Sequence, residues 1–127
     1  MSTAQKGFKQ DLVAVVDDDQ SVCEALESLL ESIGLNAATF GSARSFLESP
    51  KLRSVACAIL DVSMPEMDGI ELQRHLVATH PIPIIFITAH FDQKTQSQAM
   101  QAGAVRFLSK PFSDDALIDA LQSALNA

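Results

Sequence analysis

The sequence is short of several features on which whole classes of protein depend. No apolar run approaches the roughly 20 residues of a membrane-spanning helix, and Met1 to Gln10 lacks the apolar core of a signal peptide. Lys and Arg number only 9 against 16 Asp and Glu, which gives a net charge of -7. Because basic residues supply most of the affinity for phosphate backbones, this balance argues against direct binding to nucleic acid or anionic membranes. We expect a cytoplasmic protein.

Cysteine and glycine are also scarce. Cys23 and Cys57 are the only cysteines, and both lie within apolar patterns, which predicts buried free thiols rather than a disulfide. The 3 histidines share no ligand spacing with them, so a zinc site is not expected. No Gly-rich loop follows the first apolar run, which argues against a nucleotide-binding loop.

What the sequence does contain is a regular alternation of short apolar runs and helical patterns. Its 127 residues, 47% of them hydrophobic, suffice for one packed domain, which we expect over residues 11–127 after a polar tail at 1–10. The runs are apolar throughout, as in strands buried on both faces. We therefore predict an α/β, doubly wound parallel sheet with helices on both faces. The expected strands are 12–16, 36–40, 55–60, 82–87 and 105–108.

The helical segments differ in how many apolar anchors they offer. The first predicts a buried face of Val22, Ala25, Leu26, Leu29 and Ile33, and the last one of Leu117, Ile118, Leu121 and Leu125. Residues 92–102 offer only Ala99 and Met100, so we expect this helix to be the least firmly held. Asp19, Ser42 and Ser113 are predicted to cap helices.

Residues that can handle phosphate follow four of the apolar runs. Asp17 and Asp18 follow the first, Asp61 the third, Thr88 the fourth and Lys110 the fifth. The carboxyl ends of parallel strands share one edge of the sheet, so these side chains should meet there. Two carboxylates about 4 Å apart repel by roughly 4 kcal/mol at an effective dielectric near 20, and such a cluster calls for a shared proton or a cation.

Asp61 carries a further signal, because a loop containing Pro65 and Gly69 follows it and turns the chain into a helix. A carboxylate can attack phosphorus and form an aspartyl phosphate. Lys110 would then supply a cation for a phosphoryl oxygen and Thr88 a hydroxyl donor. Taken one at a time, each of these residues has an ordinary alternative role as a turn residue, helix cap or surface lysine.

Four segments together resemble the signature set of two-component response regulator receiver domains, over about 12–125. They are Val15-Val16-Asp17-Asp18-Asp19, Leu60-Asp61-Val62-Ser63-Met64-Pro65-Glu66-Met67-Asp68-Gly69, Ile87-Thr88-Ala89 and Phe107-Leu108-Ser109-Lys110-Pro111-Phe112. The resemblance implies a flavodoxin-like fold with strand order 2-1-3-4-5. The run that continues past Phe112 also resembles receivers of the nitrogen-fixation regulator group, which are linked to helix-turn-helix domains.

The resemblance also implies roles for the site residues. Asp61 would accept a phosphoryl group from a sensor histidine kinase. Mg²⁺ or Mn²⁺ would be held by Asp17, Asp18 and Asp61, with the main-chain carbonyl of Ser63 as a further ligand.

The remaining implied roles concern sensing of the phosphate. Lys110 would bind the phosphoryl group beside a cis bond to Pro111. Thr88 would swing toward the phosphate, and Phe107 would follow it inward. Ser63 and His90 would adjust the lifetime of the adduct.

The implied protein is a switch rather than an enzyme with turnover. Phosphorylation would promote a homodimer or release a C-terminal DNA-binding output domain; the alternative is a free-standing receiver in a phosphorelay. Two other classes stay open. An aspartyl-phosphate hydrolase is disfavoured because such enzymes usually have a second acid where this chain has Ser63. A flavin-binding module is disfavoured because the anionic phosphate of the cofactor would lie in an acidic crevice.

Overall fold

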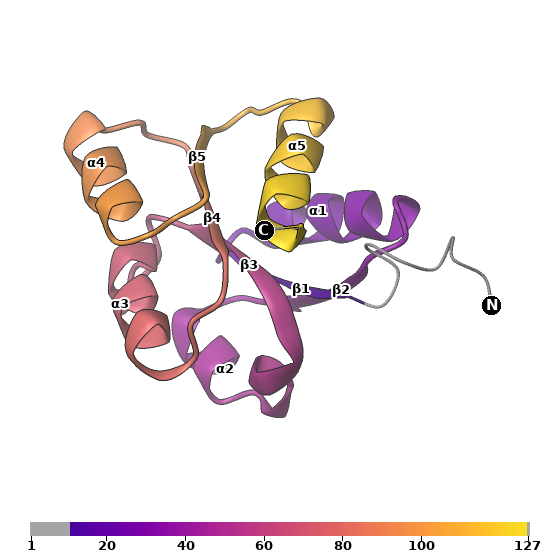
Figure 1. Ribbon diagram of the computed structural model, residues 1–127, viewed down its shortest axis with the longest axis horizontal. Coiled ribbons are helices and arrows are strands. Elements are labelled where there is room, and N and C mark those ends of the chain that lie inside the picture. Colours follow the sequence, from indigo (N-terminus) through magenta and orange to yellow (C-terminus); the bar gives the residue numbers. More distant parts are fainter. Residues whose placement is uncertain (1–10, 127) are drawn as a thin grey trace.

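The computed structural model describes residues 11–126, so the predicted tail at 1–10 lies outside the described residues. Strands and helices alternate along the chain as predicted (Figure 1). The strands are β1 (Leu12–Val16), β2 (Asn36–Phe40), β3 (Val55–Asp61), β4 (Ile84–Thr88) and β5 (Arg106–Ser109). The helices are α1 (Gln20–Ser32), α2 (Ala43–Leu47), α3 (Gly69–Thr79), α4 (Gln93–Gln101) and α5 (Asp114–Leu125), with a 3₁₀ helix at Pro50–Ser54.

All strand pairs are parallel, and the sheet order is β2-β1-β3-β4-β5, which confirms the predicted fold. Val16 pairs with Leu60, Asp61 with Ile87, and Thr88 with Ser109. These pairings align the ends of β1, β3, β4 and β5, so the residues at and just after those ends share one edge of the sheet.

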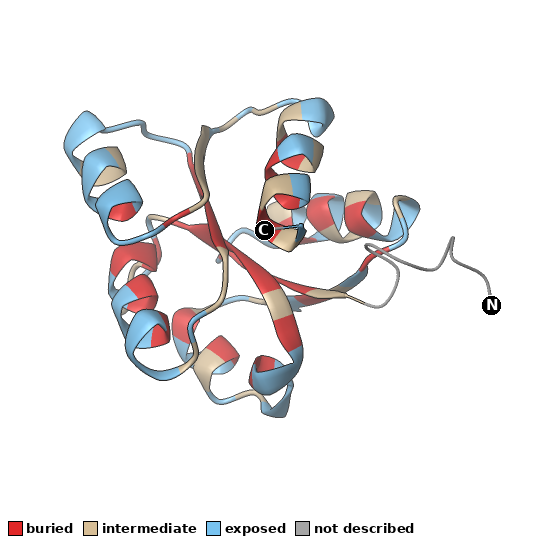
Figure 2. Ribbon diagram, in the orientation of Figure 1, coloured by how far each residue is buried: buried red, intermediate tan, exposed pale blue. Residues whose placement is uncertain are grey.

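Helices cover both faces of the sheet, with α1 and α5 on one side and α2, α3 and α4 on the other (Figure 1). The central strands β1, β3 and β4 are buried almost throughout (Figure 2). Burial on both faces accounts for their uninterrupted apolar sequences. Cys23 and Cys57 are buried and free, as predicted.

The side-chain caps that the sequence predicts are present at the helix N-termini. The side chains of Asp19, Ser42 and Ser113 accept hydrogen bonds from the backbones of α1, α2 and α5, which confirms all three predicted caps. Asp68 and Glu71 form a reciprocal capping box at the start of α3. The Lys110–Pro111 bond is cis.

Two predicted core anchors are wrong. Met100 is 41% exposed, because it lies about a quarter-turn around α4 from Ala99, the buried residue of that helix. Ala25 is exposed as well, since α1 buries Cys23, Leu26 and Leu30. The face of α1 that contains Ala25 lines an open pocket of about 420 Å³ together with Phe112.

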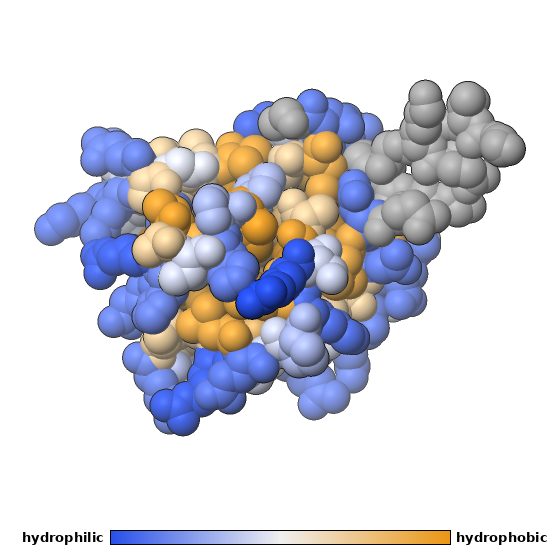
Figure 3. All heavy atoms as spheres, turned by 60° about the horizontal axis from the view of Figure 1, so that its bottom comes forward, coloured by the Kyte–Doolittle hydropathy of each residue, from blue (hydrophilic) through white to orange (hydrophobic). Residues whose placement is uncertain are grey.

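The described surface exposes few large apolar side chains, namely Val77, Phe91 and Met100. Apolar and hydrophilic residues are mixed on the face that lies at the bottom of Figure 1 and is brought forward in Figure 3. No helix within residues 11–126 is both long and apolar enough to cross a bilayer.

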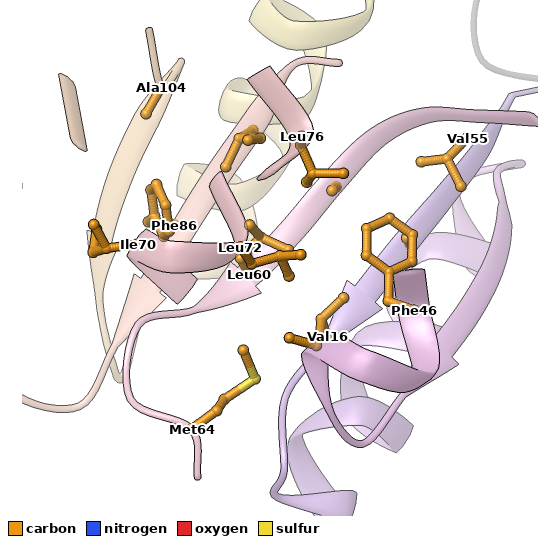
Figure 4. Packing of buried hydrophobic residues seen from close by; sticks show 14 of the residues in the cluster. Val16, Phe46, Val55, Leu60, Met64, Ile70, Leu72, Leu76, Phe86 and Ala104 are labelled. Carbon is orange, nitrogen blue, oxygen red and sulfur yellow. The ribbon is translucent and has the colours of Figure 1, made fainter. Parts of the chain in front are cut away.

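The core beneath α2, α3 and α4 also shapes the loop that follows Asp61. Met64 turns from this loop into the cluster that contains Val16, Leu60 and Phe86 (Figure 4). Leu72 and Leu76 of α3 are fully buried in the same cluster. Packing therefore anchors both the β3–α3 loop, through Met64, and the helix that follows it.

Candidate functional site

Three carboxylates meet at the carboxyl edge of the sheet, as the sequence predicted. Asp17 and Asp18 follow β1, Asp61 ends β3, and one carboxylate oxygen of each lies within 4.8 Å of the others. Asp17 is 1% exposed and Asp61 is 5% exposed, whereas Asp18 is open to solvent. Carboxylate oxygens are the ligands that Mg²⁺ prefers, so these residues fit a divalent cation that enters from the side of Asp18.

Lys110 brings a positive charge to this cluster of carboxylates. Its Nζ donates a hydrogen bond to Asp17 Oδ2 at 2.9 Å and lies 3.6 Å from Asp61 Oδ1. The backbone places it there, because the Lys110 amide donates to the Thr88 carbonyl at 2.7 Å. One ammonium cannot balance three carboxylates, so the site keeps an excess of negative charge that favours a divalent cation.

The Asp61 carboxyl is strongly affected by its surroundings. Burial and the neighbouring charge of Asp17 raise its pKa to about 6, against the opposing effect of Lys110. Burial lowers the pKa of Lys110, but its hydrogen bond to Asp17 and the charge of both acids outweigh this, so that the pKa is raised. A cation beside Asp61 would favour its charged form.

Asp17 is held by the chain around it. The Asp19 amide donates to Asp17 Oδ1 at 2.8 Å, and the Cys23 thiol donates to the Asp17 carbonyl at 3.3 Å. The sequence indicated Cys23 only as a core residue of α1, and nothing in its spacing signals this contact. Asp17 is therefore oriented by its neighbours before any ligand binds.

Gly69 allows α3 to approach the acceptor strand. A Cβ atom at this position would overlap the Asp61 carbonyl oxygen and would lie 3.1 Å from the ring of Phe86. The Gly69 amide donates to the Val62 carbonyl at 2.9 Å. The absence of a side chain thus lets the first turn of α3 lie directly against Asp61.

Thr88 is at the predicted edge, but its hydroxyl turns toward the β4–α4 loop. The residue is 1% exposed, and its Oγ1 donates to the His90 carbonyl and accepts from the His90 amide, both at 3.1 Å. The hydroxyl is therefore occupied by the loop backbone rather than by the acids.

Two other predicted residues flank the site. Ser63 is exposed in the β3–α3 loop, two residues after Asp61. Phe107 is half-buried on β5, and its ring centroid lies 6.0 Å from that of Phe86 and 6.2 Å from that of Phe91. Phe91 was not singled out by the sequence, since it lies in a loop without periodicity.

Comparison with known proteins gives a consistent result. A family model described as the response regulator receiver domain matches residues 13–122. The response regulator protein TmoT of Ectopseudomonas mendocina is 44% identical over 118 residues, which cover 92% of this chain and 54% of TmoT. The transcriptional regulatory protein FixJ of Bradyrhizobium diazoefficiens is 40% identical over 114 residues, or 89% of this chain and 56% of FixJ.

A solved structure of the response regulator StyR has a TM-score of 0.84 and 49% sequence identity, covering 93% of this chain and 60% of the StyR chain. This chain spans about half the length of the relatives TmoT and FixJ that it matches.

Proposed function

This chain belongs to the response regulator receiver family of two-component systems, and from that premise we propose that it accepts a phosphoryl group on Asp61. The donor is the phosphohistidine of a sensor histidine kinase. The observation that carries the proposal is the Asp61 carboxylate itself, which is buried within an acidic cluster with the Lys110 ammonium 3.6 Å away.

The chemistry follows from these positions. An Asp61 carboxylate oxygen forms a bond to phosphorus as the bond from phosphorus to the donor imidazole breaks, and the imidazole leaves with the electron pair. Lys110 pairs with an oxygen of the transferred group. The side chains of Asp17, Asp18 and Asp61 and the main-chain carbonyl of Ser63 would hold Mg²⁺ or Mn²⁺, which supplies charge neutralisation for the transferring group.

Phosphorylation then shifts a conformational equilibrium. A ligand changes populations only through different contacts in the two states. Here the new contact is a hydrogen bond from Thr88 Oγ1 to the phosphoryl group, made at the expense of its bonds to His90. Phe107 moves inward as Thr88 turns, which alters the surface formed by α4, β5 and α5.

The output of the switch is inferred from the relatives. FixJ is named a transcriptional regulatory protein, and this chain spans 56% of its length. We propose a cytoplasmic receiver that controls dimerisation or a transcription-regulating output domain. The alternative is a free-standing receiver that acts as a phosphorelay adaptor.

Acetyl phosphate with Mg²⁺, followed by intact mass measurement, tests the acceptor. The expected result is a phosphoryl adduct that hydroxylamine removes and that Asp61→Asn does not form. Rapid consumption of acetyl phosphate without an adduct would instead favour a hydrolase. Absence of both adduct and turnover would overturn the proposal.

The metal site needs its own test, because Asp18 is exposed and its loss should leave the fold intact. We expect Asp18→Ala to abolish Mg²⁺ binding and Mg²⁺-dependent phosphorylation. Asp114→Ala, which removes an exposed acid from α5, is the matched control. Equal Mg²⁺ affinity in the two variants would contradict the assignment of Asp18 as a ligand.

A further inference from the structure

Phe91 combines exposure with a specific aromatic contact. Its side chain lies in the β4–α4 loop, and the residue is 54% exposed. Its ring nonetheless packs edge-on against Phe107, with an interplanar angle of 82°. Phe107 also contacts Phe86, at an interplanar angle of 43°. The half-buried Phe107 ring thus contacts both a core aromatic residue and a surface aromatic residue.

The same loop binds the Thr88 hydroxyl. Thr88 Oγ1 donates to the carbonyl of His90 and accepts from its amide, and Phe91 is the next residue in the chain. The position of the Phe91 ring on Phe107 and the position of the His90 backbone on Thr88 are therefore coupled through a single peptide unit.

The attachment of α4 is uneven along its length. Near the C-terminal end, Ala99 is fully buried, and its carbonyl accepts hydrogen bonds from Gln73 Nε2 at 3.0 Å and from the Ala104 amide at 3.1 Å. The stretch from Asp92 to Gln98 is exposed or half-buried. The position of the N-terminal part of α4 thus depends on the contacts of the β4–α4 loop. Phe91 is the large apolar side chain of that loop.

We propose that Phe91 is a positioning residue of the switch, which holds the β4–α4 loop so that the Thr88 hydroxyl stays on His90 and away from Asp61. This inference rests on the proposed function. The contact between Phe91 and Phe107 exists in the state with Thr88 bonded to His90. It must break or rearrange when Thr88 turns and Phe107 moves inward, so it favours the unphosphorylated state.

The size of the effect follows from the strength of an edge-to-face aromatic pair. Removing one such pair should shift the equilibrium between the two states by about 2- to 10-fold toward the phosphorylated conformation. Phe91→Tyr keeps the ring and should behave as the wild type. Met100→Ala truncates another exposed apolar side chain, near the far end of α4, and is the matched control.

Two measurements on the whole chain test this proposal. The first needs no ligand: hydrogen exchange of the His90 amide, which is bonded to Thr88 Oγ1, should accelerate about 2- to 10-fold in Phe91→Ala. Exchange of the Ala104 amide, bonded to Ala99 at the far end of α4, should not change. The second is the affinity for beryllofluoride with Mg²⁺, a phosphoryl mimic, which should rise by the same factor.

The outcomes separate this inference from the proposed function. A wild type that does not bind beryllofluoride would overturn both. A wild type that binds it, with Phe91→Ala matching Met100→Ala in both measurements, would overturn only the role of Phe91. Faster exchange at His90 and Ala104 alike would show general loosening of α4 and would also count against a positioning role.

Discussion

Lys110 Nζ donates a hydrogen bond to Asp17 Oδ2 at 2.9 Å, although the two residues are 93 positions apart in the sequence. The contact joins the end of β5 to the end of β1 across β3 and β4, and it brings the ammonium to 3.6 Å from Asp61. A single cation therefore offsets the repulsion between two buried acids. Its removal is the most direct test of how the site is balanced.

We expect Lys110→Met to destabilise the metal-free protein at pH 7 by about 2 kcal/mol, because a charged hydrogen bond is lost and two buried carboxylates remain. Urea denaturation in the presence of a chelator measures this. Lys110→Arg is the control, since it keeps the charge, and Mg²⁺ should recover part of the loss. An unchanged unfolding midpoint in Lys110→Met would contradict the prediction.

The raised pKa of Asp61 predicts a pH dependence of stability. The folded protein binds a proton at Asp61 with a pKa of about 6, against an ordinary value of 3.8. Asp61 therefore contributes stability that is present below pH 4 and is lost as the pH rises to 6. Between pH 7 and pH 5 the metal-free protein should gain about 1.4 kcal/mol from this group.

The measurement is chemical denaturation of the wild type and Asp61→Asn at both pH values, without metal. The difference between the two proteins isolates Asp61 from other titrating groups. We expect the variant to be the more stable at pH 7 and the gap to narrow at pH 5. Parallel pH profiles would show that Asp61 titrates at its ordinary pKa.

Gly69 should not tolerate a side chain. Gly69→Ala forces a methyl group against the Asp61 carbonyl and the Phe86 ring, and overpacking of this kind costs about 1–3 kcal/mol. Gly41→Ala is the control, because nothing lies within 4 Å of a Cβ atom there. Thermal unfolding should show a loss only at Gly69; equal melting temperatures for the two variants would refute the close approach.

Glu66 is a non-glycine residue with a φ of 69°. Left-handed backbone is costly for residues with a Cβ atom, whereas glycine adopts it freely. We expect Glu66→Gly to stabilise the protein by about 0.5 kcal/mol, after allowance for the greater freedom of glycine in the unfolded chain. Glu48→Gly, at a φ of -88°, should destabilise instead, and stabilisation by both substitutions would exclude backbone strain as the cause.

Gln73 is a buried amide that joins α3 to the end of α4 through the Ala99 carbonyl. Gln73→Met preserves the length of the side chain but removes the donor, and should cost about 1 kcal/mol. Amide exchange near the end of α4 should rise as well. Gln98→Met, at an exposed position, is the control; equal protection of α4 in both variants would exclude Gln73 as an anchor.

Much of the fold and site could be predicted because the signals are local. The apolar run ending at Leu60 requires burial on both faces, and a parallel arrangement then brings Asp17, Asp61 and Lys110 to one edge. The Asp19, Ser42 and Ser113 caps follow from the residues themselves. The prediction for Met100 is wrong because one buried residue in a short polar helix does not define a buried face. Which side of α4 faces the core depends instead on tertiary contacts, such as the hydrogen bond from Gln73 of α3 to the Ala99 carbonyl.

The residues alone show which apolar run is followed by an acid, which by a hydroxyl and which by an ammonium. Side-chain periodicity and the composition of each run suffice for this, since they depend on neighbours within a few residues. The folded structure was needed to show that Lys110 bonds to Asp17, that the Thr88 hydroxyl bonds to the His90 backbone, and that Phe91 contacts Phe107. These contacts depend on rotamers and loop paths that are set by packing between distant segments, and no local pattern encodes them.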